Sequence, residues 1–462
     1  MSERMKRFLK IANCSLLVFF LTCLSAQAVN WPLRISSQGN YLEDQDGVPF
    51  PIIGDAGWSA IVQLNQSELA TYLDNRRAKG FTAILMNAIE HEFSDRPPFN
   101  AFGQHPFTNG SVDWSVRNEA YWANVDYVLN QAKLRGIVVF LFPAYIGYQC
   151  GSQGWCVEMQ AQTNAAMTNY GQWLGTRYAN QGNIVWVHGG DANANLYSNM
   201  AGRVAALKNG IAASSSAHLH TAHSGPDRSG LDDYSGLITL NTTYSYADPK
   251  TKVQNDYSRS GSLPFTFIES WYENENGSTI KDLQSQAFIA YLGGALLGHF
   301  FGNNPVWQFS SGWSSALNSA GSISTGNIGA LMKSRAWNQL TPDYANSVVT
   351  SNKGPGIRDY KATARTTDGS TVMVWNPSTT PLTIDMTKVS GTNATGWWWN
   401  PDDNTTTLIG TLATTGARTF TPPSARRVLV LDDSSKNLPQ PGTTGSAADT
   451  IPPLAPTNLR VN

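Results

Sequence analysis

Residues 264–273, PFTFIESWYE, form the segment on which the fold prediction for this chain depends. The apolar run of residues 265–268 is bounded by Pro264 and a polar cluster, which is typical of a short buried strand. This strand delivers the carboxylate of Glu269 to its C-terminal end. A buried carboxylate is costly unless it is used or paired. Glu269 is therefore predicted to be either a functional group or half of a structural salt bridge.

Short apolar runs of the same kind recur along the chain. Each ends in polar or aromatic residues, and helical patterns separate most of them; the runs are residues 50–53, 81–86, 137–142, 184–187, 218–223, 237–240, 265–269 and 298–302. Continuous apolar strands are typical of parallel sheets buried on both faces. Eight such units predict an α/β fold, a TIM (β/α)8 barrel, over residues 29–343. A doubly wound open sheet is the alternative, but no Gly-rich dinucleotide motif follows the first strand.

The overall composition excludes several classes of protein. The chain has 462 residues, of which 41% are hydrophobic and 14% are charged, so it can form a large core and more than one domain. The formal net charge of −1 gives no reason to expect a nucleic-acid partner or an anionic membrane surface. Low charge and many aromatic residues fit a secreted protein that handles neutral polymers.

The N-terminus has the pattern of a signal peptide over residues 1–28. A basic region precedes the apolar residues 11–24, and Ala26-Gln27-Ala28 provides small residues at the expected cleavage site. The apolar stretch is short for a membrane span. We therefore expect a secreted protein, extracellular or periplasmic, without a membrane span. A lipid anchor on Cys23 is the lesser alternative.

Two cysteines remain once the signal peptide is removed. Cys150 and Cys156 flank the sequence GSQGW, and in an oxidising compartment such a close pair is predicted to form a disulfide. Two free thiols are the alternative. A zinc site is not expected, because no other Cys or His lies nearby at ligand spacing.

The composition changes after residue 342. Residues 344–433 are rich in Thr, Val, Ser and Asn, and three segments within them have strand patterns, which predicts a small all-β sandwich domain. Residues 434–449 have the composition of a flexible linker. Residues 450–462 resemble the start of a fibronectin type III module, so the chain is suspected to be part of a longer protein.

Two carboxylates stand at strand ends that are three strands apart. Asp191 follows the fourth predicted strand and Glu269 ends the seventh. Glycoside hydrolysis needs such a pair, one group to protonate the leaving oxygen and the other to attack or to activate water. Gly189 and Gly190 would allow a close approach of backbone or ligand beside Asp191. The alternative for Asp191 is an N-cap for the segment that follows.

Other strand ends supply candidate substrate-binding groups, although each of them alone could equally serve packing; they are Asp55, Trp58, Tyr145, His188, His223, Tyr244, Trp271 and Trp307. The run Glu90-His91-Glu92 could suggest metal ligation, but its spacing fits no metal motif, so no metal site is predicted. A protease is not supported, because no nucleophile elbow and no metal motif is present.

Several of these motifs resemble one enzyme family. The sequences GDAGW at 54–58, NIVWVHGGD at 183–191, FIESWYE at 267–273 and HFFGNNPVWQF at 299–309 resemble the apiosidase-like glycoside hydrolases of family 140. The resemblance covers residues 30–433. It implies a TIM-barrel catalytic domain followed by a small β-domain that carries a collagen-binding label. It also implies that Asp191 is the catalytic acid/base and Glu269 the second catalytic carboxylate.

The resemblance also implies a substrate class. Activity in the family is the removal of apiose from a pectin side chain, which implies an oligo- or polysaccharide substrate here; another pentofuranoside or plant glycan stays open. Glu269 is expected to be the nucleophile of a retaining mechanism, with Glu273 as the second choice. We expect no cofactor and a monomer whose β-domain packs against the barrel. The alternative is a non-catalytic carbohydrate- or matrix-binding surface protein, which the two carboxylates disfavour.

Overall fold

The computed structural model describes residues 28–111, 113–259, 263–351, 353–354, 356 and 358–443. Residues 1–27 of the expected signal peptide, residues 444–449 of the expected linker and the fibronectin-like residues 450–462 lie outside the described residues. Among the described residues, no helix is both long enough and apolar enough to span a bilayer.

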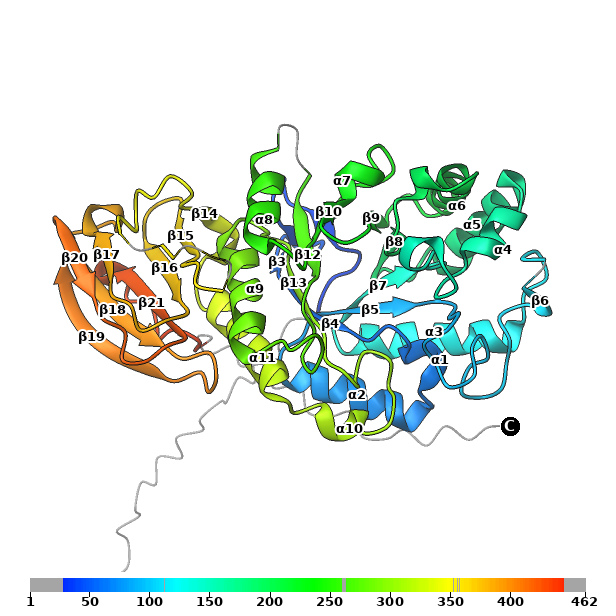
Figure 1. The fold of residues 1–462 in the computed structure, drawn as a ribbon, viewed down its shortest axis with the longest axis horizontal. Coiled ribbons are helices and arrows are strands. Elements are labelled where there is room, and N and C mark those ends of the chain that lie inside the picture. Colours follow the sequence, from blue (N-terminus) through cyan, green and yellow to red (C-terminus); the bar gives the residue numbers. More distant parts are fainter. Residues whose placement is uncertain are drawn as a thin grey trace, which may run out of the picture. The chain divides into compact units, whose positions relative to one another are not determined.

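The larger part of the described chain is a barrel of parallel strands surrounded by helices (Figure 1). In the described residues, eight parallel strands follow one another around the sheet: β4 (Ile52–Ala56), β5 (Ala83–Asn87), β7 (Val138–Phe142), β8 (Ile184–Gly189), β9 (Leu219–His223), β11 (Asn241–Tyr244), β12 (Phe265–Glu269) and β13 (Gly298–Phe301). Strand β13 pairs with β4, so the sheet closes on itself there. Between β9 and β11 the barrel is held by the hydroxyls of Thr221 and Thr242, which donate to backbone carbonyls across the gap. The predicted TIM barrel is confirmed as a nearly closed barrel.

Each parallel strand is followed by a helix that covers the outside of the barrel. In chain order these are α2 (Gln66–Ala78), α3 (Glu119–Leu134), α5 (Asn164–Tyr178), α6 (Met200–Ser214), α7 (Gly230–Asp233), α8 (Pro249–Ser258), α9 (Ile280–Leu292) and α11 (Ala320–Lys333). Local sequence sets the start of α2, because Asn65 and Glu68 form a reciprocal capping box. The segment between β7 and β8 contains two helices, α4 (Cys156–Ala161) and α5.

The described chain also contains several shorter elements. They are the small antiparallel sheet β1 (Arg34–Ile35), β2 (Leu42–Glu43) and β3 (Pro49–Phe50), the strands β6 (Thr108–Ser111) and β10 (Arg228–Ser229), and the helices α1 (Ala60–Gln63) and α10 (Trp313–Ala316).

The sixth barrel strand is displaced from its predicted position. Residues 237–240 were expected to form it, whereas β11 is Asn241–Tyr244. This polar strand can be buried because its side chains find partners: Thr242 Oγ1 donates to the Ala222 carbonyl, and Thr243 Oγ1 donates to Asp256 Oδ2 at 2.6 Å. A search for apolar runs misses a strand whose β-branched residues are threonines.

Side chains along each barrel strand alternate between the barrel interior and the helix layer. In β7, Phe140 and Phe142 belong to the interior cluster, whereas Val139 and Leu141 pack with the helices. All of these residues are buried, so the apolar pattern of the strand is continuous. The face on which a strand-end residue lies therefore depends on its position along the strand and not on its polarity.

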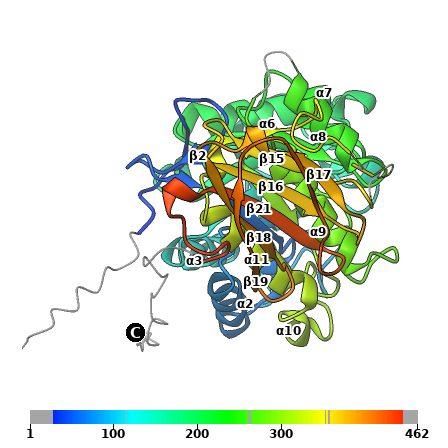
Figure 2. The same cartoon turned by 90° about the vertical axis from the view of Figure 1, so that its left-hand side faces the viewer.

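The second domain is an antiparallel β-sandwich. Its larger sheet has the strand order β14 (Leu340–Pro342), β15 (Thr363–Thr366), β16 (Thr371–Asn376), β21 (Arg427–Asp433), β18 (Asn393–Trp399) and β19 (Thr406–Ala413), and its smaller sheet pairs β17 (Leu382–Asp385) with β20 (Ala417–Phe420). Figure 2 shows β15, β16, β21 and β18 side by side. Val372, Leu429 and Leu431 of the larger sheet pack with Leu382 and Phe420 of the smaller one.

The opposite face of the larger sheet packs on barrel helix α9. The ring of Trp375 stacks on that of Phe288 with a centroid distance of 4.7 Å, and its Nε1 donates to Ser285 Oγ at 3.2 Å. Arg335 follows α11 and forms a bidentate ion pair with Asp432, with N–O distances of 2.9 and 2.7 Å. These contacts join the two domains through buried apolar and charged groups.

Candidate active site

Asp191 and Glu269 line one cavity of about 190 Å³ at the C-terminal ends of the barrel strands. This is the end at which TIM-barrel enzymes build their sites. The cavity is lined by aromatic, amide and carboxylate side chains: Trp58, Asn87, Phe93, Tyr145, Gln153, Asp191, Glu269, Tyr272, Glu275 and Trp307. The structure therefore brings together the two carboxylates that the sequence pairs.

A glycine-dependent turn after β8 positions Asp191. The φ angles of Gly189, Gly190 and Asp191 are 81°, 124° and 56°, all in the region that favours glycine. A Cβ on Gly190 would lie 2.2 Å from Tyr145 Cδ2, so only glycine admits that ring. The Tyr145 hydroxyl then donates to Asp191 Oδ2 at 3.1 Å. The N-cap alternative for Asp191 is wrong, because the next helical segment is capped by Asn193.

His223 connects the two carboxylate-bearing segments. Its Nδ1 accepts the backbone N–H of Asp191 at 3.1 Å, so the ring proton is assigned to Nε2. Nε2 lies 2.6 Å from Glu269 Oε2 and donates to it, while the Tyr246 hydroxyl donates to Glu269 Oε1 at 3.3 Å. Among the described residues, no Lys or Arg forms an ion pair with Glu269. The side chain is therefore oriented by hydrogen-bond donors rather than by a structural cation.

The protonation of Asp191 depends on its burial. Burial, reinforced by the negative charge of Glu269, raises the pKa of Asp191 from 3.8 to about 6, and His223 only partly offsets this shift. Near pH 6 about half of the molecules would then carry the proton. A carboxyl group that holds its proton at this pH can act as a general acid.

Five of the predicted substrate-binding residues lie in or against the cavity. Trp58, Tyr145 and Trp307 line it, and Trp58 Nε1 donates to the Tyr272 hydroxyl at 2.8 Å. His223 lies behind Glu269, and the ring of Tyr244 lies 4.8 Å from that of His223.

The other three predicted substrate-binding residues do not line the cavity, which corrects the prediction. Asp55 is fully buried and accepts bonds from Tyr72 and Arg76 of α2, both at 2.6 Å. His188 is paired with His220 at 2.9 Å, and the ring of Trp271 lies under Arg358 at 5.4 Å. Asp55 and His188 occupy the helix-facing positions of their strands, since Ala56 and Val187 next to them face the interior.

Sequence reasoning missed five of the lining residues. They are Asn87, Phe93, Gln153, Tyr272 and Glu275. Asn87 ends β5 and could have been found by the strand-end criterion. Gln153 is carried by the loop that the Cys150–Cys156 disulfide closes, and this disulfide is confirmed.

Glu90, considered above for metal ligation, and Glu273, considered as the nucleophile, both have structural partners. Glu90 is buried and accepts from Ser59 Oγ at 2.9 Å and from Asn87 Nδ2 at 3.1 Å, so it supports the cavity wall. Glu273, the second choice for the nucleophile, accepts from the Gly321 N–H and from Asn303 Nδ2 and does not line the cavity. Glu269 is therefore the better placed of the two glutamates.

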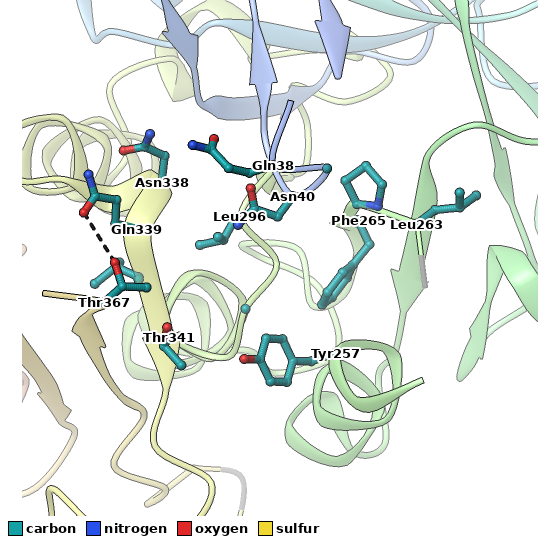
Figure 3. A pocket seen from close by; sticks show the side chains of 14 residues that line it. Gln38, Asn40, Tyr257, Leu263, Phe265, Leu296, Asn338, Gln339, Thr341 and Thr367 are labelled. Atoms are coloured by element: carbon teal, nitrogen blue, oxygen red, sulfur yellow. Dashed lines mark hydrogen bonds between the residues drawn. The ribbon is translucent and has the colours of Figure 1, made fainter. Parts of the chain in front are cut away.

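A larger cavity of about 340 Å³ lies at the opposite ends of the strands (Figure 3). Phe265, which begins β12, and Leu296, which precedes β13, form part of its wall, beside the amides of Gln38, Asn40 and Asn338. None of its described lining residues carries a carboxylate. It therefore cannot house two-carboxylate chemistry.

Comparison with known proteins agrees with this geometry. Residues 36–339 match the family model described as "Apiosidase-like, catalytic domain", and residues 342–432 match "Putative collagen-binding domain of a collagenase". No curated protein matches the chain in sequence.

Solved structures show the same fold. The crystal structure of a glycoside hydrolase family 5 protein from Bacteroides vulgatus ATCC 8482 is similar with 24% identity and a TM-score of 0.77, covering 89% of this chain and 95% of that chain. A second structure, described as a glycoside hydrolase, has 23% identity and a TM-score of 0.76, covering 88% and 98%. Because the catalytic-domain match spans residues 36–339, this chain belongs to the apiosidase-like catalytic domain family and is a glycoside hydrolase.

Proposed function

We propose that this protein is a secreted exo-acting glycosidase that removes one terminal sugar, apiose or another pentofuranoside, from a side chain of plant cell-wall pectin. The observation that carries the proposal is the pair Asp191 and Glu269 in one cavity of about 190 Å³. A cavity of this volume has room for a sugar ring beside the two carboxylates. The family to which the chain belongs supports the choice of apiose.

The proposed reaction has two steps. In the first, a carboxylate oxygen of Glu269 attacks the anomeric carbon while the bond to the leaving oxygen breaks, and that oxygen takes the proton of Asp191. In the second, Asp191 removes a proton from water, the water oxygen attacks the anomeric carbon, and the Glu269 carboxylate leaves. Two displacements at one carbon retain its configuration.

The surroundings of the two carboxylates support this division of roles. His223 Nε2 and the Tyr246 hydroxyl both donate to Glu269, which holds its carboxylate in position for attack. Burial, together with the charge of Glu269, raises the pKa of Asp191 to about 6, which favours the protonated acid at the start. Once Glu269 is esterified by the sugar this charge is gone, and the pKa of Asp191 falls as its role changes from acid to base.

Secretion is supported by the N-terminal sequence pattern and by the Cys150–Cys156 disulfide. Disulfides persist in oxidising compartments, which include the periplasm and the cell exterior.

The test is product release from pectic oligosaccharides by the mature protein, compared with Glu269→Gln and Asp191→Ala. We expect one monosaccharide to be freed by the wild type alone, with retained anomeric configuration in the first product observed by NMR. Release by either variant at the wild-type rate would overturn the assignment of the site. Failure of the wild type on pectic substrates, with release from another glycan, would overturn the proposed substrate.

A further inference from the structure

Three of the side chains that line the active-site cavity carry hydrogen-bond acceptors that the described residues leave unused. Asn87 is 1% exposed, and its Nδ2 donates to Glu90 Oε2 at 3.1 Å. This bond fixes the orientation of the amide, and Asn87 Oδ1 has no hydrogen-bond partner among the described residues. A buried acceptor without a partner at a cavity wall is available to a donor on a bound ligand.

In its ionised form, which predominates at pH 7 because its pKa is about 6, Asp191 offers a second acceptor of the same kind. Tyr145 donates to its Oδ2, whereas its Oδ1 is buried without a partner among the described residues.

Glu275 supplies a third acceptor and is held in place at the cavity wall. Its Oε1 accepts from Trp307 Nε1 at 2.7 Å and from Asn304 Nδ2 at 3.1 Å. Both donors bind the same oxygen, so Oε2 is the atom left for a ligand. Because Trp307 also lines the cavity, the carboxylate and the ring form one rigid element of the wall.

The charged residues among the described lining residues of the cavity are all acidic. Asp191, Glu269 and Glu275 line the cavity, and none of its described lining residues is Lys or Arg. A ligand hydroxyl can donate to these acceptors, but a ligand carboxylate, sulfate or phosphate could only repel them.

We propose that this cavity selects a neutral, hydroxyl-rich monosaccharide and rejects uronic acids and other anionic sugars, with Glu275 as the determinant of that selectivity. The inference rests on the proposed function, since it concerns the sugar that the same site accepts. In a polysaccharide that mixes neutral and acidic sugars, this selectivity would confine cleavage to neutral terminal residues. Glu275 acts here as a specificity-determining residue and takes no part in bond breaking.

The test is direct binding to the Glu269→Gln protein at pH 7, measured by saturation-transfer NMR. The probes are neutral aldopentoses and aldohexoses, with galacturonate and glucuronate at equal concentrations. We expect binding of at least one neutral sugar and at least about tenfold weaker binding of both uronates. Adding Glu275→Gln should strengthen uronate binding by about tenfold and leave the neutral sugar no better bound.

The matched control is Glu92→Gln, which removes the same charge from an exposed residue that does not line the cavity. It should change neither class of sugar. Uronates that bind as well as neutral sugars would overturn the inference and leave the hydrolase assignment intact. An unchanged uronate affinity in Glu275→Gln would overturn the role of Glu275. Binding of neutral sugars without hydrolysis of any pectic oligosaccharide by the wild type would instead overturn the proposed function alone.

Discussion

Asp55, which is buried, and Asp191, which is half-buried, both lie at the ends of barrel strands, and the charged groups around them differ in sign. Asp55 faces α2, where Arg76 pairs with it at 2.6 Å and also donates to the Leu317 carbonyl and Ser322 Oγ. Asp191 faces the cavity, which it shares with another carboxylate, Glu269, whose charge raises its pKa further. Burial raises the pKa of both groups, but only Asp55 has a guanidinium that offsets the shift. Asp55 thus belongs to a structural ion pair, whereas Asp191 has no Lys or Arg partner among the described residues.

The largest expected effect is the loss of turnover when a carboxylate of the cavity is replaced, compared with a carboxylate outside it. Glu269→Gln should reduce turnover by at least about 10⁴-fold, because the nucleophile is lost, while the melting temperature stays nearly unchanged. Glu273→Gln, which alters a glutamate outside the cavity, should keep turnover. Steady-state kinetics and thermal melts on both variants check this; a large loss of stability in Glu269→Gln would favour a structural role for that residue.

Breaking the ion pair between Asp55 and Arg76 should affect stability rather than turnover. Arg76→Leu leaves Asp55 buried without its cation and should cost about 3–5 kcal/mol of unfolding free energy. The double variant Asp55→Leu with Arg76→Leu should recover much of that loss, because no uncompensated charge remains. Urea unfolding gives both values. A fully additive double variant would mean that the two side chains do not interact.

The pH dependence of activity should report Asp191. With its pKa raised to about 6, the fraction of protonated acid, and with it kcat/KM, should fall about tenfold per pH unit above that value. Asp191 and Glu269 interact, so the apparent pKa of this decrease in kcat/KM belongs to the pair of carboxylates. A pH profile on an oligosaccharide substrate measures it. A kcat/KM that stays constant from pH 5 to pH 8 would exclude Asp191 as the acid.

The smallest expected effect is a change in the melting temperature when Asp191 is replaced. Since the pKa of Asp191 is about 6 in the folded chain and 3.8 is its ordinary value, its contribution to stability is present below pH 3.8 and is lost as the pH rises through 6. Asp191→Asn should therefore raise the melting temperature by about 1–3 °C at pH 7.5 and by nothing near pH 4. Asp55→Asn should lower it at pH 7.5, because Arg76 loses its partner. Thermal melts at the two pH values compare the variants directly.

Local sequence was sufficient for most elements of the barrel and for the two central carboxylates. Asn65 and Glu68 set the start of α2 through contacts three residues apart, and the apolar runs located seven of the eight strands. The exception is β11, which depends on hydrogen bonds from its threonine hydroxyls to Ala222 and Asp256, and these residues are distant in sequence. The cavity wall was harder to predict, because Asn87 reaches it from the end of β5 while Gln153 and Glu275 reach it from two separate loops.

The sequence by itself determined the alternation of strands and helices, the presence of Asp191 and Glu269 at strand ends, the cysteine pair and the family motifs. Each of these follows from neighbouring residues. Only the tertiary structure decided which strand-end groups face the cavity, because a strand buried on both faces has no polar alternation to mark its inner side. It also decided the partners: Arg76 neutralises Asp55, whereas His223 and Tyr246 orient Glu269 from other strands and loops. The pKa of a carboxylate depends on such partners, and the fold alone brings them within hydrogen-bonding distance.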